Sequence, residues 1–446
     1  MKINSRIKYF VFALIIILSG SFNFIHSQVL IDSLFIKNNS VQIDSIKISG
    51  NDITEEFIIY RELTFKPGDK ITSNDYVFNR ERLYSLRLFS KVLFLVEEEK
   101  NKLTIEVTES WYIYPLPFLH FKEKSLKKSN FGLYLLVRNF RGRNETIRTF
   151  FSFGYDKYFT IIYDNPSLFF QNDLGLSFTS SYSKFNNRSI LAEEMAGGNF
   201  IYDNFSVGIG VSKRFDQYNV LAGFAGFQYL KAPVALTRVT ASGNNIDRVS
   251  SFGAAYYYDS RDLKQFSESG MLSYISYQEK GLESKSVDYS ILEYDLRFYK
   301  TISEDFFAKV RFSGRNSFRD VPFYDQSFLG YDYLVRGESD NEREDYNVFL
   351  YSLEISYPII KSWNLSLDLP LIPKKLTSAR IDLYLSSFFD AGTTFGKNKI
   401  ISTDGYYYGY GLGLTILVLP YNAIRMEFAL NKKGVGEFLF GTGFSF

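Results

Sequence analysis

Alternating hydrophobic and polar positions dominate the chain from about residue 130 to its C-terminal end. Ile147, Phe151 and Phe153, for example, form one row, whereas Arg148 and Ser152 belong to the other. This period of two is that of a β-strand with unlike faces. Such segments are roughly 8 to 13 residues long and about 16 in number, so we predict an all-β region of about 16 antiparallel strands.

The segment before this region mixes two periodicities. Residues 41–48 alternate like a strand and end at a Gly-Asn turn signal. We expect Thr54 to cap a short helix and Ser73 to open a second one. Two further strands are predicted at 91–97 and 103–108. The order strand–helix–helix–strand–strand within about 70 residues predicts a small α+β module.

The N-terminal residues have the three parts of a secretory signal peptide. Three basic residues precede an apolar run at 9–18, and small and polar residues follow as far as Ser27. The apolar run has about ten residues, whereas a helix needs roughly 20 to cross a bilayer. We therefore predict a cleaved signal peptide and export from the cytoplasm.

Composition excludes several kinds of chemistry. The 446-residue chain has no cysteine and two histidines, one of which, His26, belongs to the predicted signal peptide. Disulfides, thiolate metal sites and multi-histidine metal sites are therefore excluded, and imidazole acid–base catalysis is disfavoured. The formal net charge is +2, without the basic excess that is typical of nucleic-acid binding. We predict no catalytic residue, no cofactor, no metal and no nucleic-acid partner.

Alternation alone does not tell which face of each strand is wet. A soluble sandwich or propeller buries its aromatic face, whereas an outer-membrane barrel turns that face toward lipid. Aromatic residues make up 18% of the chain, with 45 Phe and 34 Tyr, which is typical of the aromatic girdles of a membrane barrel. The segments also match the length of about 9–11 residues with which a tilted strand crosses hydrocarbon. These features favour an all-β transmembrane barrel.

Short motifs occur in a fixed order along the chain. They are Phe65-Lys-Pro-Gly-Asp69, Asp259-Ser-Arg261-Asp262 with Ser269-Gly270, Val335-Arg336-Gly337 and Phe388-Phe-Asp390-Ala-Gly392. In this order they resemble the outer-membrane assembly factors of the BamA/TamA family, also called the bacterial surface antigen family. The α+β module is similar to that family's polypeptide-transport-associated (POTRA) repeat. Two features depart from the family: Glu338 replaces the usual aromatic residue, and a single POTRA-like unit precedes the strands.

The resemblance implies three domains and two sites. The domains are a signal peptide at 1–27, a periplasmic POTRA-like domain at 28–110 and an outer-membrane β-barrel at 111–446. The first site is a loop that folds into the lumen and latches onto acidic wall residues, which strand parity places at two positions. This latch comprises Val335, Arg336, Gly337, Glu354 and Asp390. The second site is a lateral seam between the first and last strands, near Gly132, Gly441, Gly443 and Phe446, where glycine weakens strand pairing.

The function that the resemblance implies is insertion or translocation of client polypeptides at the outer membrane. The POTRA-like edge would receive an extended client strand by β-augmentation, and the seam would open sideways. Implied partners are unfolded outer-membrane or secreted polypeptides, membrane lipid, and accessory periplasmic proteins or lipoproteins. A passive channel or a lipid or polysaccharide transporter on the same barrel is the alternative, because lumen charges such as Glu293, Asp295, Arg297, Lys309 and Arg311 suit either. An outer-membrane enzyme finds no support in the residues.

Overall fold

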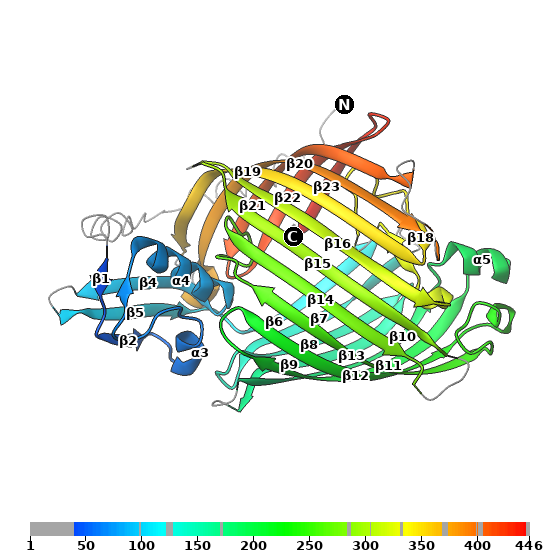
Figure 1. The fold of residues 1–446 in the computed structure, drawn as a ribbon, viewed down its shortest axis with the longest axis horizontal. Coiled ribbons are helices and arrows are strands. Elements are labelled where there is room, and N and C mark those ends of the chain that lie inside the picture. Colours follow the sequence, from blue (N-terminus) through cyan, green and yellow to red (C-terminus); the bar gives the residue numbers. More distant parts are fainter. Residues whose placement is uncertain are drawn as a thin grey trace.

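The computed structural model describes residues 40–97, 100–121, 128–169, 173–282, 287–303, 305–330, 333–367, 373–397, 399 and 405–442. These residues form an N-terminal module (residues 40–110) beside a large curved sheet (Figure 1). The predicted signal peptide at 1–27 lies outside the described residues, as do the predicted seam residues Gly443 and Phe446.

The N-terminal module, blue in Figure 1, is a small α+β unit, as predicted. Its elements are β1 (Val41–Gln42), β2 (Ser45–Ser49), α3 (Glu56–Tyr60), β3 (Lys70–Ile71), α4 (Ser73–Ser85), β4 (Phe89–Glu97) and β5 (Lys102–Glu109). A three-stranded sheet has the order β2-β5-β4, in which β2 runs parallel and β4 antiparallel to β5. Helix α4 packs against β4.

Helix α4 begins at Ser73, as predicted, whereas the cap of α3 differs from the prediction. Helix α4 starts at a capping box, in which the Asp75 N–H donates to Thr72 Oγ1 at 3.3 Å and the Thr72 N–H donates to Asp75 Oδ2 at 2.9 Å. The predicted cap of α3 was wrong, because Glu55 and not Thr54 is the N-cap residue. Thr54 instead donates through N and Oγ1 to Glu109, at 2.7 and 2.6 Å. Because the Glu109 carboxylate is buried, it requires hydrogen-bond donors, and Thr54 supplies them instead of capping α3.

Between residues 113 and 442 the described residues form a 16-stranded antiparallel sheet that curls around a lumen (Figure 1). In spatial order the strands are β6 (Ile113–Phe121), β7 (Ser129–Phe140), β8 (Glu145–Gly154), β9 (Lys157–Phe169), β10 (Leu174–Asn186), β11 (Ile201–Arg214), β12 (Asn219–Lys231), β13 (Ile246–Asp259), β14 (Gly270–Lys280), β15 (Tyr289–Thr301), β16 (Phe307–Arg319), β19 (Asn347–Ser366), β20 (Ser378–Phe395), β21 (Tyr407–Leu419), β22 (Asn422–Asn431) and β23 (Gly436–Thr442). The predicted count of 16 strands is confirmed.

Short elements occupy the connections. They are α5 (Ile190–Ala196), η4 (Val234–Leu236), η5 (Phe323–Asp325), the hairpin strands β17 (Ser327–Leu329) and β18 (Arg343–Asp345), and α6 (Lys374–Thr377). Ala192, Leu236 and Phe323 share an apolar cluster that joins α5, η4 and η5, and α5 lies at the barrel end far from the module (Figure 1). None of the helices in the described ranges is long and apolar enough to cross a membrane.

The two faces of the sheet differ as the alternation predicts. On β11, Ile209 and Val211 point outward and are 53% and 54% exposed. On β16 and β20, Lys309 and Asp390 point inward and are 0% and 1% exposed. Apolar side chains therefore cover the outside, and charged side chains are buried inside. This is the arrangement of a membrane barrel and not of a soluble sandwich.

The sheet ends at β6 on one side and at β23 on the other. The predicted seam residue Gly132 lies on β7, one strand inside the end, because the wall begins at β6 and not near residue 130. Strand β6 was not predicted because it contains Pro115 and Pro117, and proline is rare inside strands. The predicted seam residue Gly441 lies on the end strand β23, opposite Arg425 of β22.

The N-terminal module and the barrel share one hydrophobic core. Leu83 and Leu88 of the module belong to the same buried cluster as Phe266, Phe307 and Tyr384 of the barrel. Phe266 lies in the β13–β14 turn, stacks on Tyr384 with ring centroids 4.1 Å apart and meets Phe307 edge-on at 5.9 Å. The module is therefore docked on the barrel end by apolar burial, beyond its covalent link.

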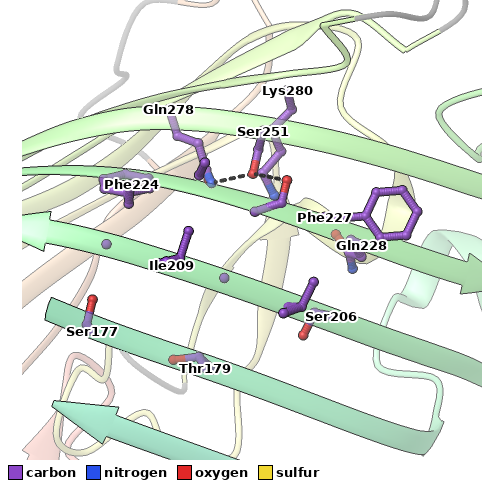
Figure 2. Close-up of a pocket in the computed structure, with 15 residues that line it drawn as sticks. Ser177, Thr179, Ser206, Ile209, Phe224, Phe227, Gln228, Ser251, Gln278 and Lys280 are labelled. Atoms are coloured by element: carbon purple, nitrogen blue, oxygen red, sulfur yellow. Dashed lines mark hydrogen bonds between the residues drawn. The ribbon is translucent and has the colours of Figure 1, made fainter.

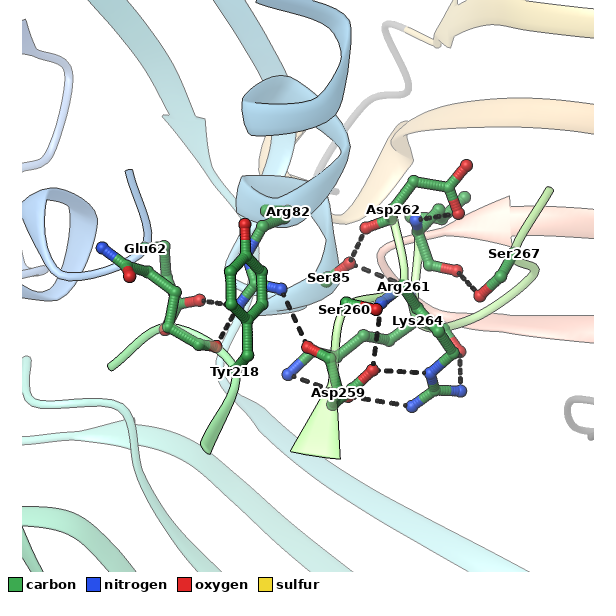
Figure 3. Close-up of polar contacts among 12 residues, drawn as sticks. Glu62, Arg82, Ser85, Tyr218, Asp259, Ser260, Arg261, Asp262, Lys264 and Ser267 are labelled. Carbon is green, nitrogen blue, oxygen red and sulfur yellow. Dashed lines mark hydrogen bonds and ion pairs between the residues drawn. The ribbon is translucent and has the colours of Figure 1, made fainter. Parts of the chain in front are cut away.

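Ion pairs surround this shared core, and Figure 3 shows Arg82 at their centre. Arg82 of α4 donates to Glu62 and to the carbonyl of Gln217, both at 2.8 Å, and lies 5.4 Å from the ring centroid of Tyr218. From the barrel, Arg214 donates to Glu62 at 2.7 Å. The Glu62 carboxylate is thus shared between a cation of the module and a cation of the barrel.

We expect Glu62 to make this docking depend on pH. Burial alone would raise the pKa of Glu62, but attraction to Arg214, Lys264 and Arg82 outweighs burial and lowers the pKa to about 2. A carboxyl group whose pKa is lowered by docking stabilises the docked state above its ordinary pKa. That stabilisation is lost as the pH falls from about 4.5 toward about 2. Spin labels on Lys47→Cys and Lys231→Cys should report undocking as a longer inter-label distance.

The Glu62→Gln variant is the matched comparison, because it keeps the side-chain shape and removes the titration. Arg380 lowers the pKa of Glu81 against the effect of burial, so some pH dependence remains in both proteins. The difference between the two profiles isolates Glu62. Identical profiles for the wild type and Glu62→Gln would show that another group controls docking.

Candidate functional site: a lumenal latch beside the end of the sheet

The loop after the eleventh strand returns into the lumen. It leaves β16, forms the β17–β18 hairpin and carries Arg336 between the two hairpin strands. Leu329 and Val335 are buried and pack with Val348 and Leu350 of β19 in one apolar cluster. These contacts hold the loop inside the barrel, with Arg336 directed at the wall.

Arg336 is 6% exposed and reaches three carboxylates on the lumen wall. Its Nε and Nη2 donate to the two oxygens of Asp390 at 2.6 and 2.9 Å, which is a bidentate pair. Its Nη1 donates to Glu427 Oε1 at 2.8 Å and lies 3.5 Å from Glu354 Oε2. The guanidinium carbon also lies 3.6 Å from the ring centroid of Phe388. One side chain therefore ties together β19, β20 and β22.

Two glycines make room for the loop backbone. Gly337 has φ +96°, a conformation that favours glycine, and it lies against the backbone of Leu430 and Asn431. On β21, Gly409 faces the carbonyl oxygen of Arg336, and a Cβ at this position would lie 1.9 Å from that oxygen. The inward glycine of β21 thus lets the loop backbone touch the wall.

The same loop also reaches the last strand of the sheet. Ser339 donates through its hydroxyl and its N–H to the Glu437 carboxylate on β23. Glu338, which occupies the position of the usual aromatic residue, is 5% exposed and accepts a hydrogen bond from Asn341 Nδ2. The Glu338 carboxylate is therefore hydrogen-bonded within its own loop, and the loop contacts β23 through Ser339.

A second buried ion pair connects the latch with the module. Lys309 of β16 donates to Glu354 Oε1 at 3.0 Å, and both groups are buried. The Lys309 ammonium lies 3.2 Å from the ring centroid of Phe266, which belongs to the core shared with the module. The neighbouring Gln265 donates to the carbonyl of Tyr84 at the end of α4, at 3.2 Å. Contacts therefore run without a break from the latch to α4.

Strand parity predicts that Glu354 and Asp390 lie inside the barrel, and the structure brings both to Arg336. Glu427 is a third partner of Arg336 that the predicted latch lacks. A signal was present, because Glu427 stands between Met426 and Phe428 on a strand whose outward positions are apolar. A carboxylate at an inward position of such a strand needs a cation in the lumen.

Strands β10 to β14 present a different inner surface, which Figure 2 shows around a cavity of about 300 Å³. The polar residues that line it include Ser177, Thr179, Ser206, Gln228, Ser251 and Gln278. Gln278 Nε2 donates to Ser251 Oγ at 3.1 Å. The predicted lumen charges gather instead on β15 and β16, where Asp295 pairs with Arg297 at 2.6 Å and with Arg311 at 2.9 Å. The latch thus belongs to the charged side of the lumen.

Little in the described residues offers other chemistry. His120 lies on β6, opposite Asn130 of β7. Across the described ranges, no three His, Cys, Asp or Glu side chains are grouped so that they could hold a metal ion. The buried charges of the latch therefore hold the loop around Arg336 against the barrel wall.

Comparison with known proteins gives a family match and a shared fold. A family model described as the Omp85 superfamily domain matches residues 139–446, and a POTRA model described as a surface antigen variable number repeat matches residues 41–110. BamA from Haemophilus ducreyi lacking POTRA domains 1–3 is 14% identical, with a TM-score of 0.52, over 90% of this chain and 83% of that chain. CdiB from Escherichia coli is 11% identical, with a TM-score of 0.54, over 90% and 73%. No curated protein matches the chain.

We expect Arg336→Lys to unfasten the latch. A lysine keeps the charge but lacks the planar fork that holds Asp390 while reaching Glu427. Breaking a buried ion pair from one side costs roughly 3–5 kcal/mol, and less where lumen water reaches it. Denaturant unfolding of the detergent-refolded protein should show a loss of that order for Arg336→Lys and for Asp390→Asn.

The double variant tests whether the two residues are partners. Because each single change already breaks the same pair, the double variant should lose less than the sum of the two single losses. Strictly additive losses would show that Arg336 and Asp390 act independently, and the latch assignment would be wrong.

We expect Gly409→Ala to displace the loop without changing any charge. The added Cβ would lie 1.9 Å from the Arg336 carbonyl oxygen, so the loop backbone has to move. Trypsin should then cleave the folded protein after Arg336, which is buried in the wild type. Gly223→Ala on β12 is the matched control, because nothing lies within 4 Å of its added Cβ. Equal cleavage of the two glycine variants would contradict the assigned contact.

Proposed function

The chain belongs to the Omp85 superfamily, and on that premise we propose that it inserts or translocates client polypeptides at the bacterial outer membrane. The barrel spans that membrane, and the N-terminal module faces the periplasm. The clients are unfolded outer-membrane or secreted polypeptides, with membrane lipid around the barrel and accessory periplasmic proteins or lipoproteins as further partners. The proposal involves no catalysis.

The observation that carries this proposal is a shortage of hydrogen-bond donors on the end strand β6. Proline has no N–H, so Pro115 and Pro117 fit into β6 only if their missing donors face away from β7. The two prolines share one parity, which puts both gaps on the edge that would meet β23. On β23, Gly436 and Gly441 further weaken strand pairing. A seam between β6 and β23 is therefore weaker than a fully bonded strand pair.

A weak seam suits the insertion of a new strand. An extended client can pair with the edge of β23, and backbone hydrogen bonds give affinity for clients of varied sequence. Each bond that the client forms with β23 replaces one that the seam gives up, which lowers the cost of opening the seam in hydrocarbon. The module offers a second edge at β2, an end strand of its sheet, where a client can dock first.

The latch gives this seam a control element. Ser339 holds Glu437 of β23, while Arg336 holds β19, β20 and β22. Withdrawal of the loop would remove its contact with β23 and leave that strand held by its pairing with β22. The contacts through Lys309 and Phe266 would transmit movement of the module to the latch.

A passive channel or a transporter of lipid or polysaccharide requires an open lumen. Hydrogen bonds join the module to turns at its end of the barrel, through Glu55 to Gly142, Gln217 to Leu63, Gln265 to Tyr84 and Arg87 to Pro420. These turns extend from β7–β8 to β21–β22, so the module spans the mouth. The latch loop occupies the lumen above it. The module and the latch loop both obstruct the lumen, which favours passage of the client at the seam.

We expect the combined change Pro115→Val and Pro117→Val to strengthen the seam. Each valine restores an N–H donor toward β23 and favours the strand conformation. Two backbone hydrogen bonds would stabilise the barrel by about 1–3 kcal/mol. In liposomes, the variant should insert a denatured barrel client more slowly than the wild type, while its own thermal unfolding temperature rises. Pro233→Val, at a proline outside the sheet, is the matched control.

A covalent lock on the seam provides the decisive comparison. The chain has no cysteine, so one cysteine on β6 and one on β23 can be paired without background. Oxidation should abolish client insertion, and reduction should restore it. Unimpaired insertion by a fully locked barrel would exclude the seam and point to a route through the lumen.

A further inference from the structure

An arginine-rich cavity of about 590 Å³ lies inside the barrel at the β6 end of the sheet. Its lining includes Arg87 of the module, Tyr114 of β6, Tyr134 and Arg138 of β7, Arg148 of β8 and Tyr421 of the β21–β22 turn. Neither the latch nor the client proposal uses this cavity.

Guanidinium groups outnumber carboxylates in the lining. Arg87, Arg138 and Arg148 face one acidic residue, Asp164, so three positive charges against one negative leave a net +2. Arg148 donates to Asp164 at 2.6 Å, and its Nε is buried with no hydrogen-bond partner in the described part of the chain. Arg138 Nη1 donates at 3.3 Å to the neutral carbonyl of Pro420. Within the described residues, Arg148 thus keeps a buried unpaired N–H and Arg138 donates to a neutral group, so an anion in the cavity would compensate both.

The backbone of Arg87 adds a second, independent observation. Arg87 follows the C-cap residue Leu86 of α4 and has φ +60°, in the left-handed region where glycine is preferred. Its Nε donates to the Pro420 carbonyl at 3.2 Å and its Nη2 donates to the Tyr421 carbonyl, and these bonds hold the side chain at the cavity. Burial first and the Arg138 charge second lower the pKa of Arg87 to about 10. Left-handed backbone at a non-glycine residue occurs at functional sites and also in turns, such as the one that holds Arg141 in this chain.

We propose that this cavity binds a phosphate group, either on a membrane lipid or free in solution. Forked guanidinium N–H groups match phosphate oxygens, and guanidiniums from the module, β7 and β8 can surround one tetrahedral group. Tyr114, Leu116 and Tyr134 supply an apolar wall for the body of an amphiphile. Because the cavity touches the end strand β6, a lipid headgroup would enter beside the seam.

The test is a binding measurement that requires no client insertion, so it is independent of the proposed function. Full-length protein in maltoside detergent is titrated calorimetrically with inorganic phosphate and with dihexanoyl phosphatidic acid. Arg87→Gln and Arg138→Gln should each weaken binding roughly tenfold or more, as expected for loss of a charge-assisted hydrogen bond. Arg138→Lys, which keeps the charge, should fall between these variants and the wild type. Arg248→Gln removes the same charge from an exposed position at the other end of the barrel and should bind like the wild type.

The two probes separate the sources of phosphate. Binding of the lipid alone would assign the site to a headgroup, whereas competition by inorganic phosphate would show that the phosphate group suffices. The proposal is overturned if the wild type binds neither probe or if Arg248→Gln loses as much as Arg138→Gln. It is also overturned if a peptide with a free C-terminal carboxylate binds more tightly than either probe and loses affinity on amidation. Heat-modifiable migration verifies that each variant is folded, and Arg138→Lys serves if the glutamine variant is not.

Discussion

A sheet that lies in hydrocarbon has to find a partner for every backbone N–H and C=O group. Sixteen strands meet this constraint along most of their length, which leaves the outer edges of β6 and β23 as the places where it is still open. Pro115 and Pro117 change the balance there, because they remove two donors that an open seam would otherwise leave unpaired. The same change leaves two acceptors on the facing strand without donors. The sequence of β6 therefore makes the closed seam weaker and the open seam less costly.

The remaining structure can be understood from what surrounds this weak edge. The latch joins β19, β20 and β22 through Arg336 and reaches β23 through Ser339, so it stiffens the wall on one side of the seam. The module contacts turns from β7–β8 to β21–β22 and shares a core with the barrel around Phe266. Lys309 touches both systems, since it pairs with Glu354 and lies against Phe266. Rigidity is thus built around the seam and not into it.

Much of this could be predicted from the sequence, because the period-two pattern is a local property. Strand number, the outward and inward faces, and the inward positions of Glu354 and Asp390 all follow from alternation. Strand β6 could not be found this way, since its prolines break the pattern that identifies strands. Thr54 and Glu427 were misread or missed because their partners, Glu109 and Arg336, are far away in sequence and adjacent only once the chain has folded. The shared core of module and barrel could not be predicted either. Apolar residues such as Leu83 would be expected in the same sequence positions if the module did not contact the barrel.

Charge balance links opening of the latch to water in the lumen. The buried cluster contains the cations Arg336, Lys309 and Arg425 and the carboxylates of Asp390, Glu354 and Glu427. Three positive and three negative charges balance while the loop is seated. Withdrawal of Arg336 leaves two against three, an excess negative charge that water has to solvate. The return of Arg336 to the wall restores the balance, so charge favours the seated loop and with it the contact between Ser339 and β23.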